Sequence, residues 1–345
     1  MLLSEVSAAL DIAKPALSSK DYVPIFQHFI FDKKTVLAFN DRMAIEVDLE
    51  SELDCAVPGD LLIQFLKSGK GGTNDDLDVE IKDGTAKFFC LGFEFELPIL
   101  DKEKSIFVAP EYTDTINISG DFRKAVSLCL VSVDDNSPLP EYNCVQYIPL
   151  IGEMYASNGI TISKYILEPI SGKPKDMRLY LPNEFCKAFL AASEEDTEYK
   201  LHMAGDMVVI DLGSVRLFTK QPTPEKVLDF ESVIKKITEG LCMPVEVFPG
   251  LWNALGRAQI LSKDTSPSTE LVINKEDGFA RLTTKTGMGI VEDVLSCEDH
   301  DSITAIISAS LISKALSICS YISVSEKCVE LSDGYLYFYY VANRA

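Results

Sequence analysis

Residues 58–67 of the chain read PGDLLIQFLK, and LDVEI (77–81), TAKFFCL (85–91) and FEFELPIL (93–100) follow. The first segment places apolar residues three or four positions apart, which predicts a short amphipathic helix. The later segments are rich in β-branched and aromatic residues, and Asp83-Gly84 marks a hairpin turn between two of them. This stretch therefore predicts a helix followed by antiparallel strands.

The same pattern occurs six times, at intervals of about 60 residues. The units begin near Leu2, Pro58, Asp121, Asn183, Pro249 and Ser308. A fixed period indicates one supersecondary unit used repeatedly, and pairs of units would form three domains of roughly 115 residues each. We therefore expect an α+β fold with similar domains at residues 1–110, 111–240 and 241–345.

The composition is that of a globular protein, because 47% of the 345 residues are hydrophobic. No run of about 18 apolar residues is present to span a membrane. Glu5 and Asp11 lie where a signal peptide would need a basic start and an uninterrupted apolar stretch. The nine cysteines include no C-x-x-C pair, which indicates reduced thiols. We expect a cytoplasmic protein without a membrane partner.

The charge of the chain is unevenly distributed. A net charge of −21, from 32 Lys+Arg and 53 Asp+Glu, excludes a general attraction of the whole molecule to nucleic acid. The predicted helices and the residues just after them nevertheless contain ten cations: Lys14, Lys20, Lys67, Lys70, Arg123, Lys124, Lys187, Arg257, Lys263 and Lys314. The helices themselves hold five acids: Glu5, Asp11, Asp60, Asp121 and Glu184. Basic helices in an acidic protein favour binding to phosphates, although lysines also keep a polar helix face soluble.

The sequence contains no clear catalytic constellation. His28 and His202 lie inside alternating strand patterns, where a half-buried or surface histidine is expected instead of a general base. The segment CEDHD (297–301), with His300, resembles a metal site in composition, but consecutive residues rarely converge on one ion. SGKGGT (68–73) lacks the spacing of a phosphate-binding loop. We expect a non-catalytic protein without a metal or cofactor.

A protein of repeated helix-plus-sheet units, acidic overall and basic on its helices, resembles the sliding clamps of DNA replication. It most resembles the three-domain β clamp of bacterial DNA polymerase III, over almost the whole chain. The segments that carry this resemblance are VPIFQHFIF (23–31), LAFNDRMAIEVDL (37–49), VPGDLLIQFLK (57–67), FEFELPIL (93–100), ASNGITIS (156–163), LYLPNEFCKAFL (179–190), DFESVI (229–234), LGRAQILSKD (255–264) and GIVEDVL (289–295). Their order and spacing together are more specific than any one of them.

The resemblance implies a ring of two head-to-tail copies, because clamp rings contain six similar domains. A trimer of two-domain chains suits this length less well. The ten helix cations would then line the hole around double-stranded DNA without reading its bases. Topological linkage would hold a DNA polymerase at the primer end as a processivity factor. A clamp loader and other proteins with clamp-binding motifs are the further partners that the resemblance implies.

Clamps bind partner motifs in an apolar pocket between the second and third domains. The positions that match are Gly159, Ile160, Ile162, Ile234, Val341 and Ala342. These aliphatic residues could instead fill a core or an interface. Thr161 stands where the family commonly has Arg, and the chain ends VANRA in place of a Met-Pro-Met-Arg-Leu type of ending. These departures indicate a divergent lineage, in a bacterial cell or a phage-infected host.

Two other classes of protein are compatible with the sequence. A clamp-like scaffold would bind proteins without encircling DNA, and its activity would survive neutralisation of the helix cations. An enzyme could assemble its site across a dimer interface, but that requires a cluster of histidines and carboxylates in a cleft. Three scattered histidines do not favour this last class.

Overall fold

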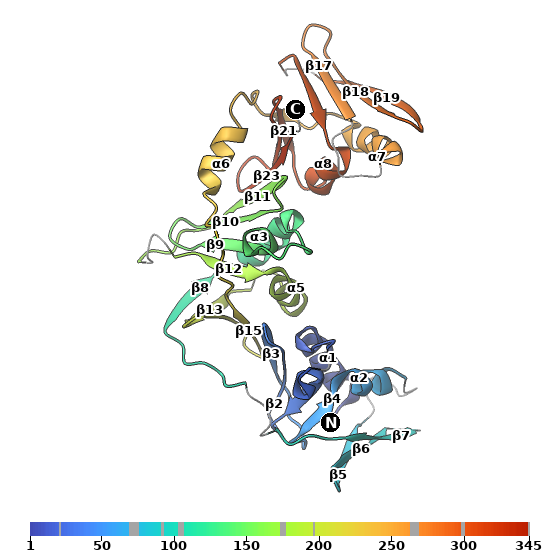
Figure 1. The fold of residues 1–345 in the computed structure, drawn as a ribbon, viewed down its shortest axis with the longest axis vertical. Helices are drawn as coiled ribbons and strands as arrows, with labels where there is room; N and C mark the ends of the chain where they lie inside the picture. The colour runs from blue at the N-terminus through green and yellow to red at the C-terminus, as the bar shows by residue number, and fades with distance from the viewer. Residues whose placement is uncertain are drawn as a thin grey trace. The chain divides into compact units, whose positions relative to one another are not determined.

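The computed structural model describes residues 1–20, 22–68, 76–90, 93–102, 107–172, 177–195, 197–262, 269–297 and 301–343. A helix begins within two residues of each of the six predicted positions (Figure 1). These helices are α1 (Leu3–Ala13), α2 (Gly59–Ser68), α3 (Asp121–Cys129), α5 (Asn183–Ala192), α7 (Leu251–Leu261) and α8 (Ala309–Leu316). Four strands lie between each of these helices and the next, and three follow α8. All pairings among the described strands are antiparallel, so the predicted α+β fold is confirmed.

Two of the four sheets have eight strands. The first has the order β4-β1-β2-β3-β15-β14-β13-β8. Its strands are β1 (His28–Phe31), β2 (Thr35–Phe39), β3 (Met43–Asp48), β4 (Ala56–Pro58), β8 (Asp114–Ile118), β13 (Tyr199–Ala204), β14 (Met207–Asp211) and β15 (Val215–Lys220). At its centre β3 pairs with β15, and Ile45 lies opposite Leu217. Segments more than 160 residues apart in the sequence thus share one sheet.

The second eight-stranded sheet has the order β12-β9-β10-β11-β23-β22-β21-β16. Its strands are β9 (Cys144–Ile148), β10 (Glu153–Ser157), β11 (Thr161–Ile166), β12 (Leu179–Pro182), β16 (Val245–Glu246), β21 (Tyr321–Val324), β22 (Cys328–Ser332) and β23 (Tyr337–Ala342). At its centre β11 pairs with β23, and Ser163 lies opposite Tyr339. The two large sheets therefore have the same plan.

The two smaller sheets have three and four strands. The first has the order β5-β6-β7, from β5 (Asp78–Lys82), β6 (Thr85–Cys90) and β7 (Phe93–Pro98). The second has the order β19-β18-β17-β20, from β17 (Thr269–Asn274), β18 (Phe279–Thr286), β19 (Gly289–Ser296) and β20 (Ile303–Ile307). In these two sheets β7 and β19 are edge strands.

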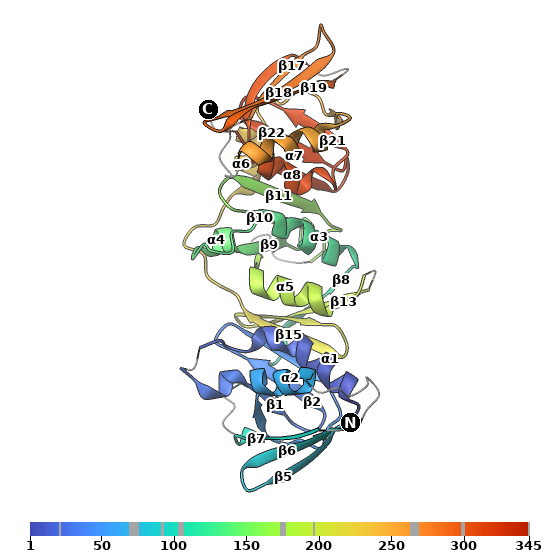
Figure 2. The ribbon, with the colours of Figure 1, turned by 90° about the vertical axis from the view of Figure 1, so that its right-hand side faces the viewer.

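The described residues form two compact units, Met1–Arg123 with Glu184–Gln221, and Lys124–Asn183 with Pro222–Ala345. In the first unit α1 and α2 lie side by side over the face of the sheet that buries Ile45 and Val47 (Figure 2). In the second unit α7 and α8 pack together, and the hydroxyl of Tyr339 donates a hydrogen bond to the carbonyl oxygen of Leu311 on α8. Helices therefore cover one face of each large sheet.

Two local features were not predicted. Within VPIFQHFIF (23–31), Pro24–Gln27 forms a 3-10 helix just before β1, because proline fixes φ at the start of a helical turn. A helix, α6 (Phe230–Ile237), begins within DFESVI (229–234). The Asp229 carboxylate accepts a hydrogen bond from the backbone N–H of Ser232 and caps this helix. The short helix α4 (Pro140–Asn143) likewise precedes β9.

Candidate nucleic-acid interface and partner surfaces

The predicted DNA-contacting cations lie on the six helices or just after them. In the described part of the chain, seven have solvent-exposed side chains: Lys14, Lys20, Lys67, Lys124, Lys187, Arg257 and Lys314. Arg123 is half-buried, and Lys70 and Lys263 lie outside the described residues. Exposed cations on the helices of an acidic protein provide local attraction for phosphate groups.

Arg123 is held by the end of a neighbouring helix. Its Nη2 donates a hydrogen bond to the carbonyl oxygen of Leu190 at 3.1 Å, and its Nε donates to that of Ser193 at 3.2 Å. Carbonyl groups in the last turn of a helix lack partners within that helix, so a guanidinium there stabilises the helix end. Arg123 therefore connects the start of α3 to the end of α5, whereas the side chain of Lys124 is solvent-exposed.

Arg257 and Lys67 each form an ion pair with a carboxylate. Arg257 on α7 donates from Nε to both carboxylate oxygens of Asp293 on β19, at 3.1 and 3.2 Å. The Nζ of Lys67 on α2 lies 2.8 Å from Oδ1 of Asp11 on α1. A neighbouring carboxylate offsets the field of each cation, so we expect these two to attract phosphates less strongly than an unpaired lysine.

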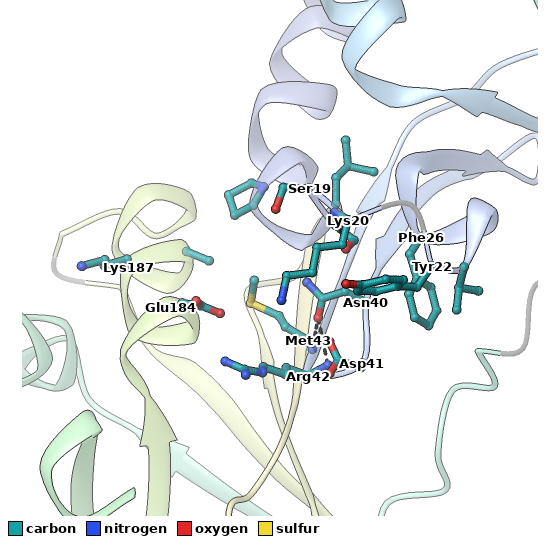
Figure 3. Close-up of a pocket in the computed structure, with 15 residues that line it drawn as sticks. Ser19, Lys20, Tyr22, Phe26, Asn40, Asp41, Arg42, Met43, Glu184 and Lys187 are labelled. Atoms are coloured by element: carbon teal, nitrogen blue, oxygen red, sulfur yellow. Dashed lines mark hydrogen bonds between the residues drawn. The ribbon is translucent and has the colours of Figure 1, made fainter. Parts of the chain in front are cut away.

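Lys20 and Lys187 line the same groove. The groove lies between the segment before β1, the β2–β3 turn and α5, and has a volume of about 840 Å³. The turn adds a third cation, Arg42 (Figure 3). The side-chain oxygen of Asn40 accepts hydrogen bonds from the backbone N–H groups of Arg42 and Met43, each at 2.9 Å, and so fixes the turn that presents Arg42.

Arg42 was not among the predicted cations, because it lies on a hairpin and not on a helix. Its position between two alternating strands was a signal for an exposed turn residue. Its place in the same groove as Lys187 depends on how segments about 145 residues apart in the sequence pack together. A single-chain pattern does not reveal such a contact.

Only some of the residues predicted to form the partner pocket lie together on one surface. Ile162 on β11 and Ile234 on α6 pack into the same apolar cluster, with Tyr340 of β23. Gly159 is exposed in the β10–β11 turn at φ 82°, a left-handed conformation that suits glycine. The neighbouring Ile160 is half-buried.

The remaining predicted pocket residues, Val341 and Ala342, lie at the end of β23 in different surroundings. The backbone N–H of Ala342 donates to the carbonyl oxygen of Ile160 at 2.9 Å, so Ala342 lies beside the turn. Val341 is fully buried opposite Thr161. Because side chains alternate along a strand, Val341 shares the helix-covered face with Tyr339 and does not face the cluster.

Aromatic residues that were not predicted as pocket residues dominate this cluster. Tyr155 of β10 and Phe230 of α6 stack with ring centroids 4.8 Å apart and planes at 3°. Figure 1 shows α6 on the side of the sheet opposite α3. The spacing of Phe230, Ile234 and Ile237 is the helical signal that could have identified α6 as the helix that covers this cluster.

The two described histidines have structural surroundings. The Nδ1 of His28 lies 2.7 Å from the carbonyl oxygen of Pro24, and burial lowers the pKa of this imidazole. His202 is buried, with Nδ1 2.9 Å from the hydroxyl of Thr115. Among the described residues no three His, Cys, Asp or Glu side chains cluster to hold a metal ion, and His300 lies outside these residues. None of the described helices has the length and apolar character needed to cross a bilayer.

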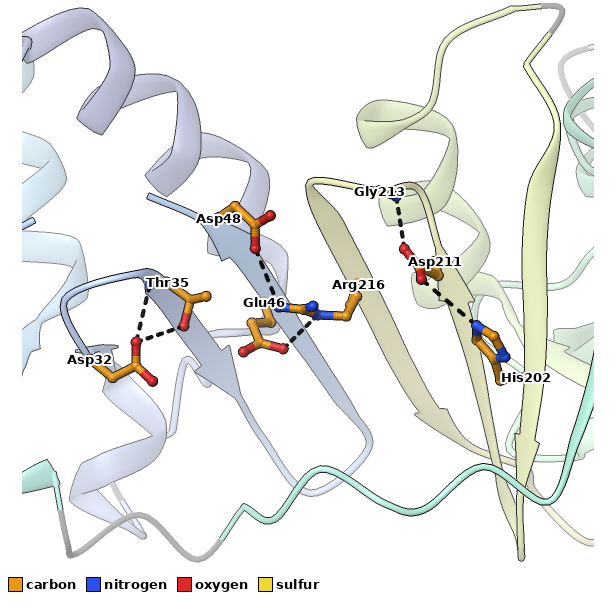
Figure 4. Close-up of polar contacts among 8 residues, drawn as sticks. All are labelled: Asp32, Thr35, Glu46, Asp48, His202, Asp211, Gly213 and Arg216. Carbon is orange, nitrogen blue, oxygen red and sulfur yellow. Dashed lines mark hydrogen bonds and ion pairs between the residues drawn. The ribbon is translucent and has the colours of Figure 1, made fainter. Parts of the chain in front are cut away.

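The third strands of the repeat units join two units in two places. The third strands β3 and β15 pair with each other, as do β11 and β23. In the first of these joins, the Nε of Arg216 on β15 donates to the Glu46 carboxylate on β3 at 2.9 Å (Figure 4). The two remaining third strands, β7 and β19, have one paired side each among the described residues.

Exposed apolar side chains accompany both unpaired edges. Near β7, Leu61 and Phe65 of α2 are 45% and 37% exposed, and Phe65 stacks on Phe95 of β7 with centroids 4.7 Å apart. On β19, Ile290 is 62% exposed, and Ile260 on the adjacent α7 is 70% exposed. Exposed strand edges with neighbouring apolar residues are typical of interfaces.

No protein-family model matches this sequence, and no curated protein matches it either. Solved structures match over nearly their whole length. The DNA polymerase III beta subunit from Thermotoga maritima is 17% identical, and the match covers 100% of this chain and 98% of that one at a TM-score of 0.85. The DnaN sliding clamp from Pseudomonas aeruginosa bound to griselimycin is 12% identical, with 100% and 98% covered and a TM-score of 0.87.

A third similar structure is the Helicobacter pylori beta clamp bound to a DNA ligase peptide. It is 14% identical, the match covers 100% of this chain and 99% of that one, and the TM-score is 0.82. These likenesses establish the fold: the chain has the three-domain architecture of the beta sliding clamps, with a divergent sequence.

Proposed function

We propose that this chain is a DNA sliding clamp, a non-catalytic processivity factor that encircles duplex DNA and tethers a replicative DNA polymerase. The observation that carries the proposal is the pair of unpaired third strands. Four of the six third strands are joined within the chain, and β7 and β19 remain. Pairing β7 of one copy with β19 of another would repeat the join seen twice within the chain.

Such pairing is head-to-tail, because the two edges belong to opposite ends of the chain. Two copies would contribute six domains and close a ring. The exposed side chains of Leu61 and Phe65 would meet those of Ile260 and Ile290 at each new join. Burial of these four apolar side chains would favour the dimer over the monomer.

The exposed helix cations support the DNA-binding part of the proposal. Lys124, Lys187 and Lys314 are solvent-exposed on three different helices. Lysines that meet phosphates through water and counterions attract any DNA sequence and leave it able to slide. Encirclement, and not affinity, would keep the protein on DNA.

The proposed partners are the polymerase, a clamp loader and proteins with short clamp-binding motifs. The likeness to a clamp bound to a DNA ligase peptide supports motif binding. For this chain we place such a motif over Ile162, Ile234 and the turn at Gly159. The proposed location is the cytoplasm of a bacterial cell or of a phage-infected host.

Retention on circular DNA tests the proposal. The protein is loaded on a nicked plasmid with a loader-containing extract and washed at high salt. The plasmid is then linearised, and the fraction of protein that stays bound is measured. A clamp stays on circles through the wash and leaves linear ends, whereas salt removes an electrostatic complex from both. Equal release from circles and linear DNA by a dimeric protein would instead support a protein-binding scaffold.

A further inference from the structure

The groove near Lys20 contains a strongly exposed aromatic residue. Tyr22 is 85% exposed, and it lines the groove together with the half-buried Phe26. Figure 3 shows the two rings next to Asn40, at one side of the groove. An exposed ring beside a groove of about 840 Å³ can accept a planar ligand.

The charges that line this groove differ from those of the whole chain. Lys20, Arg42 and Lys187 come from three separate elements, and two carboxylates, Asp41 and Glu184, also line the groove. Among the described residues that line the groove, cations are therefore the majority, in a protein with a net charge of −21. A basic groove with an exposed aromatic side chain is the combination that binds single-stranded nucleic acid, because cations follow the backbone and rings stack on bases.

We infer that this groove binds single-stranded DNA, with an unpaired base stacked on Tyr22 and the adjacent phosphates near Lys20 and Arg42. The inference rests on the proposed function and adds to it a contact that duplex DNA does not make. In a duplex each base is already stacked between its neighbours, so the Tyr22 ring finds a base face only on an unpaired nucleotide. The contact would place the single-stranded template beside the clamp at a primer end.

The carboxylates limit where the phosphates lie. Asp41 is the neighbour of Arg42 in the turn, and Glu184 lies in the first turn of α5, three residues before Lys187. Phosphates would be repelled by Glu184 and attracted by Lys20. The strand therefore follows the side of the groove formed by Lys20, Tyr22 and Arg42.

Fluorescence anisotropy with labelled oligo-dT and with a duplex of equal length tests the inference in the full-length protein at low salt. Tyr22→Ala should lower the ratio of single-stranded to duplex affinity about fivefold or more, because stacking contributes about 1–3 kcal/mol per base. Tyr22→Phe keeps the ring and should keep the ratio. Tyr335→Ala removes a tyrosine that is 80% exposed on the β22–β23 turn and serves as the matched control.

Arg42→Ala provides a second, charge-based variant. It should reduce the slope of log affinity against log salt for oligo-dT by about 0.7, the value for one phosphate contact on a single strand. An unchanged affinity ratio in Tyr22→Ala, or an equal ratio change in Tyr335→Ala, would overturn the inference. Retention on circular DNA is a separate measurement, so the groove assignment and the clamp proposal can fail independently.

Discussion

The ring of Tyr112 lies against the ring of His202, with centroids 4.0 Å apart and planes at 6°. Tyr112 belongs to the segment that leads into β8, and His202 belongs to β13. The Nε2 of His202 lies 3.8 Å from the Asp211 carboxylate (Figure 4). At the start of the same segment, Phe107 contacts Phe218 at 5.2 Å. Aromatic contacts thus hold both ends of residues 107–112 on the sheet face opposite α1.

Removal of the Tyr112 ring should loosen this segment. An aromatic pair contributes about 0.5–1.5 kcal/mol, so Tyr112→Ala should raise amide exchange in residues 107–113 by up to about tenfold. Hydrogen exchange with mass spectrometry of the full-length protein measures this change. Tyr112→Phe retains the stack and is the control. Equal exchange in the wild type and in Tyr112→Ala would show that other contacts hold the segment.

Arg123 and Lys124 are neighbours for which we predict opposite effects. Arg123→Ala leaves carbonyl groups at the end of α5 without their donor and should lower the free energy of unfolding by roughly 1–3 kcal/mol. Lys124→Ala removes an exposed charge and should leave stability within about 0.5 kcal/mol. Chemical denaturation of both variants measures the difference.

The same two variants separate stability from DNA attraction. Lys124→Ala should reduce the slope of log duplex affinity against log salt by about 0.9 if Lys124 meets one phosphate. Measurements are made well below the unfolding midpoint of each variant. A larger slope change in Arg123→Ala than in Lys124→Ala would mean that Arg123 reaches DNA and that its contacts with α5 are secondary.

Local patterns predicted the repeat well because each unit is built from short-range signals. The apolar spacing in PGDLLIQFLK and the alternation in MAIEVDL depend only on neighbouring residues, and α2 and β3 appear at those positions. The pairing of β3 with β15 joins residues more than 160 positions apart, and no periodicity encodes it. Antiparallel sheets were therefore predictable, and the pairing of strands from different repeat units was not.

The candidate site residues show the same difference between short-range signals and long-range contacts. Exposed helix positions such as Lys124 were predictable from helical spacing. Val341 was predicted in the partner pocket, but strand alternation together with its pairing to Thr161 places it on the helix-covered face. Arg123 was predicted to contact DNA, and its hydrogen bonds to α5 were not foreseeable without the fold. The structure thus shows Arg123 hydrogen-bonded to α5 and Val341 buried, and a DNA contact of Arg123 stays a prediction.

Glu330 should make stability depend on pH. It lies on β22 opposite Tyr340, and burial raises the pKa of its carboxyl although a hydrogen bond from Tyr340 opposes the rise. A carboxyl whose pKa is higher in the folded state binds its proton more tightly there. Stability is therefore lost as the pH rises from the unfolded-state pKa through the folded-state pKa.

The variant Glu330→Gln should remove this loss. Glutamine keeps an oxygen that accepts from the Tyr340 hydroxyl and carries no charge to desolvate. The melting temperature of the variant should exceed that of the wild type at pH 7, and the two should converge near pH 4. Melting curves between pH 4 and 8 measure the difference. Parallel curves would mean that Glu330 ionises in the fold without cost.

The unpaired strand β19 should be a dimer surface. Ile260 on α7 is 70% exposed beside β19, and Ile290 is 62% exposed on β19 itself. Ile260→Asp would place a charge in the proposed join with β7 of a second copy, where its desolvation is costly. The variant should be a monomer at concentrations where the wild type is a dimer, as measured by analytical ultracentrifugation.

Ile306 offers a matched control for Ile260. It is 41% exposed and lies on β20, the opposite edge strand of the same sheet. Ile306→Asp adds the same charge to the same sheet without touching the proposed join, so the dimer should persist. If Ile306→Asp dissociates the protein and Ile260→Asp does not, the copies meet at β20 and the ring model is wrong. If Ile260→Asp alone dissociates it, loss of retention on circular DNA by this variant would connect the join at β19 to encirclement.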